Sequence, residues 1–332
     1  MQSHIPDAQP IVVVCSADEN YAMPLTVTIY SALSNLASKA TKILLFIMDG
    51  GIKKATKRKI ESSLRSNQLE IQWIQIDRNQ YKNLPELRYL TVAAYYRLLV
   101  AEVLPKEFEK VIYLDSDMVV LGPLEELWRV ELGDKPVLAI RNGYCHLFWH
   151  VPGLSNYKEL GLNPDSLYFN SGLLVINLQK WREDRIGAKA LEFIEQNRAT
   201  IQDPDQDALN AVLEGQWGEL DPRWNQMPQI YEFSDWKESP LDDPETYQSV
   251  LDDPLIVHYA ISKPWHLTCN HPAIPLFEHY LDQTAWAGVR DTRLKLFIRK
   301  VKRKIHSWRN SLNENYASSS LAKTASESTV KV

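Results

Sequence analysis

The chain has 332 residues, of which 45% are hydrophobic, and a formal net charge of −5, which suits one large α/β domain or two small ones. Its three cysteines are odd in number and lack the spacing of metal ligands, which argues against a disulfide framework and against a zinc site. A reducing compartment is therefore favoured. The first ten residues lack the basic start and apolar core of a signal peptide, and we expect no membrane span because no stretch reaches about 18 consecutive apolar residues.

Apolar runs alternate with helical periodicity along the chain. Buried strands are predicted at residues 11–15, 43–48, 69–76 and 110–114. The helices predicted between them span residues 24–38, 53–66 and 91–103. Later strands, partly antiparallel, are predicted at 137–140 and 172–178, and helices at 186–197 and 206–213. Proline-rich loops and a short strand at 255–258 follow them. We therefore predict an α/β fold with right-handed βαβ units and a mostly parallel sheet.

Two carboxylates, Asp115 and Asp117, follow the strand predicted at 110–114. Open α/β sheets bind their ligands at the carboxyl ends of strands, where two unpaired buried carboxylates would be prohibitively costly. Because hard oxygen ligands suit Mg²⁺ or Mn²⁺, the motif predicts a divalent cation that holds a phosphate. The alternative is a solvated turn in which the two aspartates only cap the next segment.

Residues 17–21 follow the first predicted strand and therefore lie at the same sheet edge as Asp115. Asp18 and Asn20 are suited to hydrogen-bond a base and a ribose, and Tyr21 is suited to stack on a base. An N-cap and a turn into the following helix is the alternative, and it is favoured for this segment taken alone.

Six segments occur in an order that carries a family resemblance: 17–21, 95–97, 115–117, 168–182, 205–210 and 258–265. Together they resemble the retaining glycosyltransferases of family 8, including lipopolysaccharide galactosyl- and glucosyltransferases, in register from residue 11 to 286. The resemblance implies a GT-A fold over residues 1–288, with a Rossmann-like nucleotide-sugar half merged with an acceptor half. It also implies a UDP-hexose donor, Mn²⁺ or Mg²⁺ as cofactor, a saccharide or glycolipid acceptor and transfer with retention.

The resemblance also implies roles for individual residues. Asp115, Asp117 and His258 would ligate the metal, which with Lys263 would neutralise the charge on departing UDP. Gln206 would face the anomeric carbon from the side opposite UDP, with Asp205 beside it as a second catalytic residue. The expected substrate-binding residues are Ala17, Asp18, Asn20, Tyr21, Arg97, Ser116, Asn170, Ser171 and Lys263.

Retention of configuration poses the main mechanistic question. A double displacement needs a good nucleophile on the far face of the sugar, whereas Gln206 is an amide and a poor one. A front-face route, with Gln206 stabilising positive charge through its carbonyl oxygen, therefore fits better.

The chain also departs from the family pattern, because five steps separate His258 from Lys263 and no glycine lies between them. This change could alter the loop over the diphosphate, affect donor affinity or impair the site.

The basic charge is concentrated near the carboxyl end of the chain. Residues 290–309 carry nine Lys or Arg and one acid, a local charge of +8, while the remainder is near −13. Apolar residues recur there at helical spacing, so we predict a basic amphipathic helix over 289–309 that binds an anionic membrane surface. Docking on the acidic body of the protein is the alternative, and the acidic remainder disfavours nucleic acid. Residues 310–332 are predicted to be disordered, and the protein to be cytoplasmic at the inner face of the membrane.

Two other functions fit part of the pattern. A phosphatase of the haloacid-dehalogenase type also has an Asp-x-Asp motif after an apolar strand, but about a hundred residues precede the motif here and no convincing later acidic pair follows. A non-catalytic, membrane-associated nucleotide-sugar-binding relative is supported only by the short segment between His258 and Lys263, and the intact Asp115, Asp117 and Gln206 argue against it.

Overall fold

The computed structural model of the protein describes residues 9–77, 81, 84, 92–143, 145–241 and 243–290. The chain divides into two units, one of Met1–Pro264 with Asn270–Gly288 and the other of Trp265–Cys269 with Val289–Val332. Apart from Val289 and Arg290, the predicted basic helix and the predicted tail lie outside the described residues. Every element named below belongs to the first unit.

The elements follow one another as strands and helices along the chain. The strands are β1 (Ile11–Ala17), β2 (Ile43–Asp49), β3 (Leu69–Gln75), β4 (Lys110–Leu114), β5 (Met118–Val120), β6 (Val137–Arg141), β7 (Phe169–Asn177), β8 (Gly218–Glu219) and β9 (Ile256–His258). The α-helices are α1 (Ala22–Ser34), α2 (Lys54–Ser63), α3 (Val100–Val103), α4 (Leu124–Arg129), α5 (Leu178–Glu183), α6 (Ile186–Gln196), α7 (Pro204–Val212), α8 (Pro244–Asp252) and α9 (Ile274–Leu281). The 3₁₀ helices are η2 (Val92–Leu99), η3 (Phe148–His150), η4 (Pro152–Leu154), η5 (Pro222–Asn225), η6 (Pro228–Tyr231) and η7 (Trp236–Glu238).

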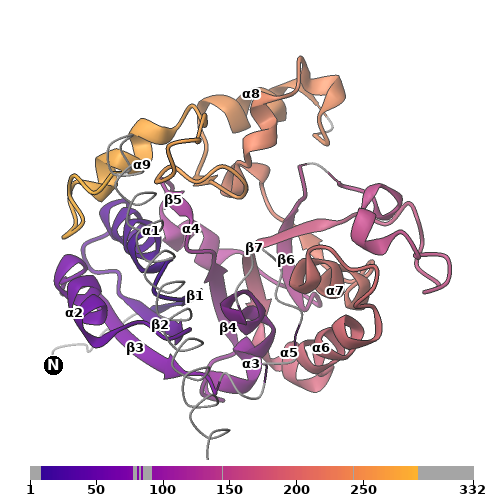
Figure 1. The fold of residues 1–332 in the computed structure, drawn as a ribbon, viewed down its shortest axis with the longest axis horizontal. Coiled ribbons are helices and arrows are strands. Elements are labelled where there is room, and N and C mark those ends of the chain that lie inside the picture. The colour runs from indigo at the N-terminus through magenta and orange to yellow at the C-terminus, as the bar shows by residue number, and fades with distance from the viewer. Residues whose placement is uncertain are drawn as a thin grey trace, which may run out of the picture. The chain divides into compact units, whose positions relative to one another are not determined.

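A seven-stranded sheet forms the centre of the first unit (Figure 1), with the strand order β3-β2-β1-β4-β7-β6-β8. Strands β3, β2, β1 and β4 are parallel to one another, and β8 is parallel to β6. Strand β7 is antiparallel to both β4 and β6, so it is the one reversed strand in this sheet. The prediction of a mostly parallel sheet with an antiparallel part is confirmed.

The burial of each strand follows its sequence pattern. Strands β1 and β2 are continuous apolar runs and are buried along their whole length, as expected for central strands of a parallel sheet. The edge strand β3 alternates apolar and polar residues, and the exposure of its side chains alternates accordingly. On one face of the sheet, Val12 and Val14 of β1 share a core with η2, α6 and α7. Their neighbours Val13 and Cys15 point to the other face.

A second, two-stranded sheet consists of β5 and β9, paired antiparallel with Met118 opposite His258. Strand β9 corresponds to the strand predicted at 255–258, whereas β5 was not predicted.

The helix predicted at 91–103 is a 3₁₀ helix, η2, followed by the short α3. None of the described helices combines the length and the hydrophobicity that crossing a bilayer requires.

The prediction of only loops between residues 213 and 255 is wrong, because α8 lies within that stretch. The Asp243 side chain accepts a hydrogen bond from the backbone N–H of Thr246. Pro244 occupies the first turn, where a backbone N–H would have no partner within the helix, so that its absence there costs nothing.

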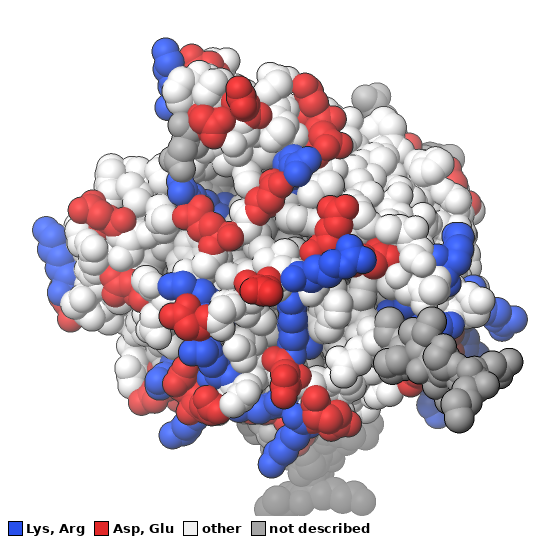
Figure 2. Space-filling model, turned by 180° about the vertical axis from the view of Figure 1, so that it is seen from behind, with Lys and Arg blue, Asp and Glu red and all other residues white. Residues whose placement is uncertain are grey.

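Figure 2 shows that acidic and basic side chains are interspersed on the described part of the face turned away from the viewer of Figure 1.

Candidate active site

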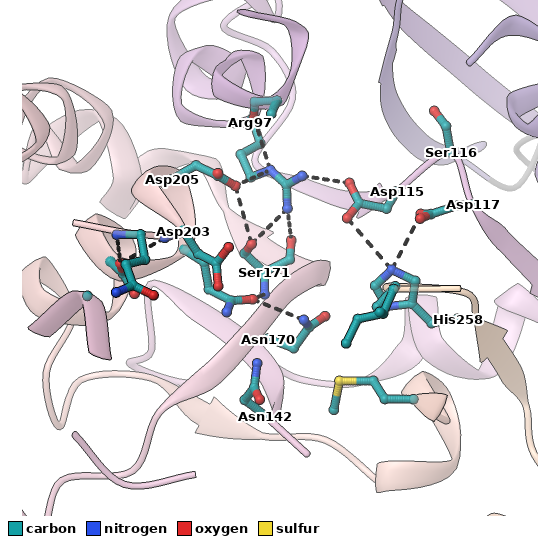
Figure 3. A pocket seen from close by; sticks show the side chains of 18 of the residues that line it. Arg97, Asp115, Ser116, Asp117, Asn142, Asn170, Ser171, Asp203, Asp205 and His258 are labelled. Atoms are coloured by element: carbon teal, nitrogen blue, oxygen red, sulfur yellow. Dashed lines mark hydrogen bonds and ion pairs between the residues drawn. The ribbon is translucent and has the colours of Figure 1, made fainter. Parts of the chain in front are cut away.

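A cavity of about 300 Å³ lies at the edge of the sheet where β1 and β4 end. Because β7 runs antiparallel to β4, its first residues, Asn170 and Ser171, reach the same edge. Helix α7 and the end of β9 complete the wall (Figure 3). Every predicted site residue except Asn20 lines this cavity.

Hydrogen bonds from both sheets hold the segment that contains Asp115 and Asp117. The Asp115 N–H donates to the Gly172 carbonyl in β7 at 2.8 Å, and the Asp117 carbonyl accepts from Tyr259 at 2.9 Å. Between them, the Ser116 hydroxyl donates to the Ser16 carbonyl at 2.7 Å. The Asp117 residue is only 5% exposed. The solvated-turn interpretation is therefore wrong, since the two carboxylates are presented to the cavity by a buried backbone.

His258 faces both carboxylates (Figure 3). Its Nε2 lies 3.4 Å from Oδ1 of Asp117 and 3.9 Å from Oδ2 of Asp115, and one ligand atom from each of the three residues lies within 4.8 Å of the other two. Cations held at about 2.1 Å by each ligand place those ligands roughly 3 to 4 Å apart. Asp115, Asp117 and His258, called here the metal-ligand set, therefore have the spacing and chemistry to hold a divalent cation.

Gly172 leaves room for this arrangement. A Cβ atom on residue 172 would lie 2.4 Å from Cε1 of His258 and 2.9 Å from both Oδ2 of Asp115 and Oδ1 of Asn170. Any side chain larger than hydrogen would therefore displace two of the three candidate ligands. The close approach of β7 to the metal-ligand set depends on this glycine.

A chain of hydrogen bonds connects His258 to Gln206, and two backbone donors set its direction. The N–H of Ser171 donates to Oε1 of Gln206 at 3.0 Å, and the N–H of Gly172 donates to Oδ1 of Asn170 at 3.0 Å. Since backbone N–H groups can only donate, these bonds assign the oxygen atoms of both side-chain amides. The Asn170 amide nitrogen then donates to Oε1 of Gln206 at 3.0 Å.

The same chain assigns the protonated nitrogen of His258. Asn225 donates from its amide nitrogen to Oδ1 of Asn170 at 2.9 Å, so its own Oδ1 is left to face Nδ1 of His258 at 2.9 Å. Nδ1 must therefore carry the proton, and Nε2 presents its lone pair to the cavity. A ligand histidine held through its other nitrogen is typical of metal sites. Sequence reasoning missed Asn225, because no motif marks it.

Arg97 is buried in the wall of the cavity and binds both acidic elements. Its guanidinium lies 2.7 Å from Asp115 and 3.0 Å from Asp205, and it donates to the carbonyl and hydroxyl of Ser171 at 2.7 and 2.8 Å. Burial raises the pKa of Asp115, although Arg97 opposes this shift. Arg97 thus joins η2 to β4, β7 and α7 and compensates two of the carboxylates of the site.

Lys263 forms an ion pair with Asp117 and donates to the carbonyls of Tyr259 and Ala260 at 2.8 and 2.7 Å. Burial acts to raise the pKa of Asp117, but the Lys263 ammonium opposes this effect, and the pKa lies below its usual value. The short segment between His258 and Lys263 therefore still delivers the lysine to the metal-ligand set.

Helix α7 supplies two acidic residues with different surroundings. Asp205 pairs with Arg97, and Asp207 accepts the Tyr168 hydroxyl at 2.6 Å and two backbone N–H groups. Gln206 lies between them, with its amide nitrogen 3.2 Å from the Tyr168 hydroxyl. Asp203, which precedes the helix, also lines the cavity, and the sequence analysis did not select it.

Asp18 forms a local turn and also lines the cavity. Its Oδ1 accepts the N–H groups of Asn20 and Tyr21 at 2.8 and 3.1 Å, which forms the turn into α1. Ala17, Asp18 and Tyr21 also line the cavity, whereas the exposed Asn20 bonds the Asp18 carboxylate and does not line it. The turn and the binding surface are thus built from the same residues.

Comparisons with known proteins agree with this site. A sequence model of the family described as glycosyl transferase family 8 matches residues 12–269. General stress protein A of Bacillus subtilis is 33% identical over 82% of this chain and 94% of its own length. Lipopolysaccharide 1,2-glucosyltransferase of Escherichia coli K12 is 25% identical over 92% of this chain and 87% of its own length.

Solved structures of a galactosyltransferase, LgtC, are similar to this chain in fold. The complex with donor and acceptor sugar analogues gives a TM-score of 0.71 and 28% identity, covering 83% of this chain and 96% of that one. A glutamine-to-glutamate active-site mutant of the same enzyme gives a TM-score of 0.71 and 29% identity, with the same coverage.

Proposed function

Because the chain belongs to glycosyl transferase family 8, we propose that it is a hexosyltransferase that moves a hexose from a UDP-sugar to a saccharide acceptor with retention of configuration. Its fold is the GT-A fold of the solved galactosyltransferase, as the sequence analysis predicted. Membership of this family also leaves the haloacid-dehalogenase alternative without support.

The observation that carries the proposal is the convergence of two groups of residues on one cavity. The metal-ligand set lies on one side, and Gln206 with Asp205 lies on the other, with Arg97 between Asp115 and Asp205. A nucleotide sugar needs this order, because its diphosphate and its anomeric carbon are neighbouring groups. The two relatives of known activity named above are a glucosyltransferase and a galactosyltransferase, which is why a hexose is proposed.

The donor set fits Mn²⁺ or Mg²⁺. Two carboxylates and one imidazole offer three ligands, and the lone pair of Nε2 in His258 is already directed at the carboxylates. When bound there, the cation supplies Lewis-acid stabilisation of the diphosphate leaving group. In the proposed complex Lys263 leaves Asp117 for a phosphate oxygen, since the cation then compensates that carboxylate.

The remaining residues hold the donor. Asp18 and Tyr21 take the uridine, Arg97 and Asn170 contact the hexose or the diphosphate, and Ser116 and Ser171 line the passage between them. Asn20 acts on the uridine only through Asp18, whose carboxylate it bonds.

We propose a front-face substitution. The bond between the anomeric carbon and the UDP oxygen breaks, and its electron pair leaves with UDP. The acceptor hydroxyl then bonds to the anomeric carbon from the same face, and its proton passes to a phosphate oxygen of UDP. An oxocarbenium-like sugar with this geometry needs no protein nucleophile on its far face.

Gln206 is positioned, rather than nucleophilic, in this proposal. Its Oε1 already accepts from Ser171 and Asn170, and its nitrogen faces the Tyr168 hydroxyl. A side chain tethered by three hydrogen bonds presents a fixed dipole to the developing positive charge, which is how preorganised sites stabilise transition states.

We also propose that the acceptor is lipid-linked, as for the lipopolysaccharide glucosyltransferase relative, and that residues 289–309 bring the enzyme to an anionic membrane surface at the cytoplasmic side. The local charge of +8 in residues 290–309 supports this part of the proposal, because anionic lipids attract basic residues.

UDP release from UDP-glucose and UDP-galactose, measured with Mn²⁺, with Mg²⁺ and with EDTA, tests the proposal. We expect metal-dependent release from one donor, and a loss of about a hundredfold or more in Asp117→Asn, since it removes a charged ligand. Asp184→Asn, the same change at an exposed residue of the first unit, should behave as wild type. Metal-dependent UDP binding without release from any donor would contradict transfer and favour a non-catalytic relative.

A further inference from the structure

The cavity extends past the groups that the donor occupies. In Figure 3, Asp203 and Asp205 lie on one side of Ser171, while the metal-ligand set lies on the other. Beyond the residues assigned to the donor, the lining includes Asn142, Cys145, Val151, Gly153, Asp203 and Gln229, called here the distal end, and the charge of Asp203 acts on Cys145. A molecule bound there would lie beside the proposed donor, where an acceptor has room.

The Asp203 carboxylate has no hydrogen-bond or ion-pair partner among the described residues. Its two neighbours on α7 differ, because Asp205 has Arg97, and Asp207 has the Tyr168 hydroxyl and two N–H groups. Enclosure by the protein and the charges of Asp207 and Asp205 raise the pKa of Asp203 to about 6. Near neutral pH an anionic acceptor of hydrogen bonds is therefore available in the cavity.

Gln229 provides an independent indication of a ligand. Its residue is only 3% exposed, and its Oε1 has no hydrogen-bond partner within the described part of the chain. The side chain lines the cavity and packs against Gly143, at which a Cβ would lie 3.3 Å from Cβ of Gln229. Buried amide oxygens are almost always bonded, so this one is suited to a donor brought by a ligand.

The described cationic side chains of the cavity are already paired. Arg97 is bound to Asp115 and Asp205, and Lys263 is bound to Asp117. In the proposed complex Lys263 is occupied by the diphosphate of the donor. A phosphate or carboxylate on the acceptor would therefore meet the Asp203 carboxylate without a compensating cation from these residues.

We infer that the distal end binds an uncharged saccharide, whose hydroxyl groups donate to Asp203 and Gln229, and that Asp203 excludes acidic sugars from the acceptor position. This inference rests on the proposed function. Two acceptors of hydrogen bonds suit a sugar, which carries several hydroxyl donors, and hydrogen bonds to an ionised carboxylate are the stronger class. Asp203 is thus a specificity-determining residue, distinct from Gln206 and the metal-ligand set.

The test compares methyl glycosides of neutral hexoses with the matching hexuronides, which differ by one carboxylate. The readouts are transfer and the acceptor concentration that half-saturates the change in UDP release. We expect wild type to favour the neutral glycoside by at least about tenfold in kcat/KM, and Asp203→Asn to reduce that preference by about tenfold, because a repulsion between two nearby charges is removed. Asp184→Asn should retain the wild-type preference.

UDP release without acceptor separates this inference from the proposed function. Normal UDP release together with equal use of hexoside and hexuronide, an unchanged preference in Asp203→Asn, or no response to any neutral glycoside would overturn the inference alone. A chain that releases no UDP from any donor, with or without glycosides, would overturn the proposed function and this inference with it.

Discussion

Asn225 lies between His258 and Asn170, and its side chain sets the orientation of both. Its replacement by alanine leaves Nδ1 of His258 without its partner, so the imidazole is free to rotate or to change tautomer. We expect Asn225→Ala to weaken Mn²⁺ binding, followed by the paramagnetic signal of the free ion, by about 10- to 100-fold.

Asn35→Ala is the matched control for this change. Asn35 also bonds two other elements, through the Val120 carbonyl and the Tyr280 hydroxyl, but it lies outside the cavity. The control should lose stability and keep its Mn²⁺ affinity. Equal affinities in Asn225→Ala and wild type would show that Asn225 is only structural.

Asp203 should also make stability depend on pH. Its folded-state pKa of about 6 is above its usual 3.8, so the folded state holds the proton more tightly. The stability associated with that proton is present below about pH 4 and is lost as the pH rises through 6. The charged or titratable groups that interact with it are Asp205, Asp207 and Cys145, and the pKa of Cys145 is raised by burial and by the charges of Asp203 and Asp207.

We therefore expect Asp203→Asn to have a higher Tm than wild type above about pH 6, with the difference shrinking toward pH 4. Thermal unfolding across this range measures it. A difference that stays constant with pH would mean that Asp203 titrates normally.

Single residues show where prediction from sequence ends. Asp115, Asp117 and His258 could be predicted, because a motif and a family resemblance mark them. Asn225 and Gln229 could not be predicted. Asn225 matters because it bonds His258 and Asn170, which are distant in the sequence, and Gln229 because its buried Oε1 has no hydrogen-bond partner among the described residues. Gln206 is intermediate: its place was predicted, but the two donors on its carbonyl oxygen are visible only in the fold.

Among the elements, α5 holds the connection between α3 and β4 through Arg182. The Arg182 guanidinium donates to the carbonyls of Ala101, Leu104, Pro105, Lys106 and Phe108 at 2.9 to 3.4 Å. Lysine has one ammonium group and cannot span these acceptors. We expect Arg182→Lys to lower the free energy of unfolding by about 1–3 kcal/mol, measured in urea.

The exposed Arg198 is the control, because it pairs with Glu195 at the surface. Arg198→Lys should change the free energy of unfolding little. If Arg182→Lys is as stable as this control, the carbonyl cluster does not hold the connection.

The elements that sequence predicted well are the long apolar strands, where burial on both faces leaves a continuous hydrophobic run. Strand β5 has three residues and β8 has two, so they carry no period to detect. Helix η2 was predicted as α because its apolar spacing is helical, but it packs beside α6, where a Cβ on Gly187 would lie 2.0 Å from the Leu98 carbonyl oxygen. The spacing of apolar residues along the sequence does not predict such a close contact between two backbones.

For the whole molecule, the main untested expectation is membrane association. Deletion of residues 290–332 should abolish sedimentation with anionic liposomes, and high salt should weaken binding of the full chain. UDP release should persist, because the described cavity residues all precede residue 264. Liposomes of neutral lipid serve as the control, and equal sedimentation of full-length and shortened chains would rule out the predicted role.

The pairing of β5 with β9 has a consequence for how the enzyme is made. His258 follows Asp117 by about 140 residues in the sequence. Because ribosomes add roughly 5–20 residues per second, His258 is synthesised on the order of 10 s after the two carboxylates. A growing chain can assemble the parallel half of its sheet during that interval and still lack a complete ion site. The candidate ion site is therefore complete only after β9 has been synthesised, and a chain that ends before His258 lacks its third ligand.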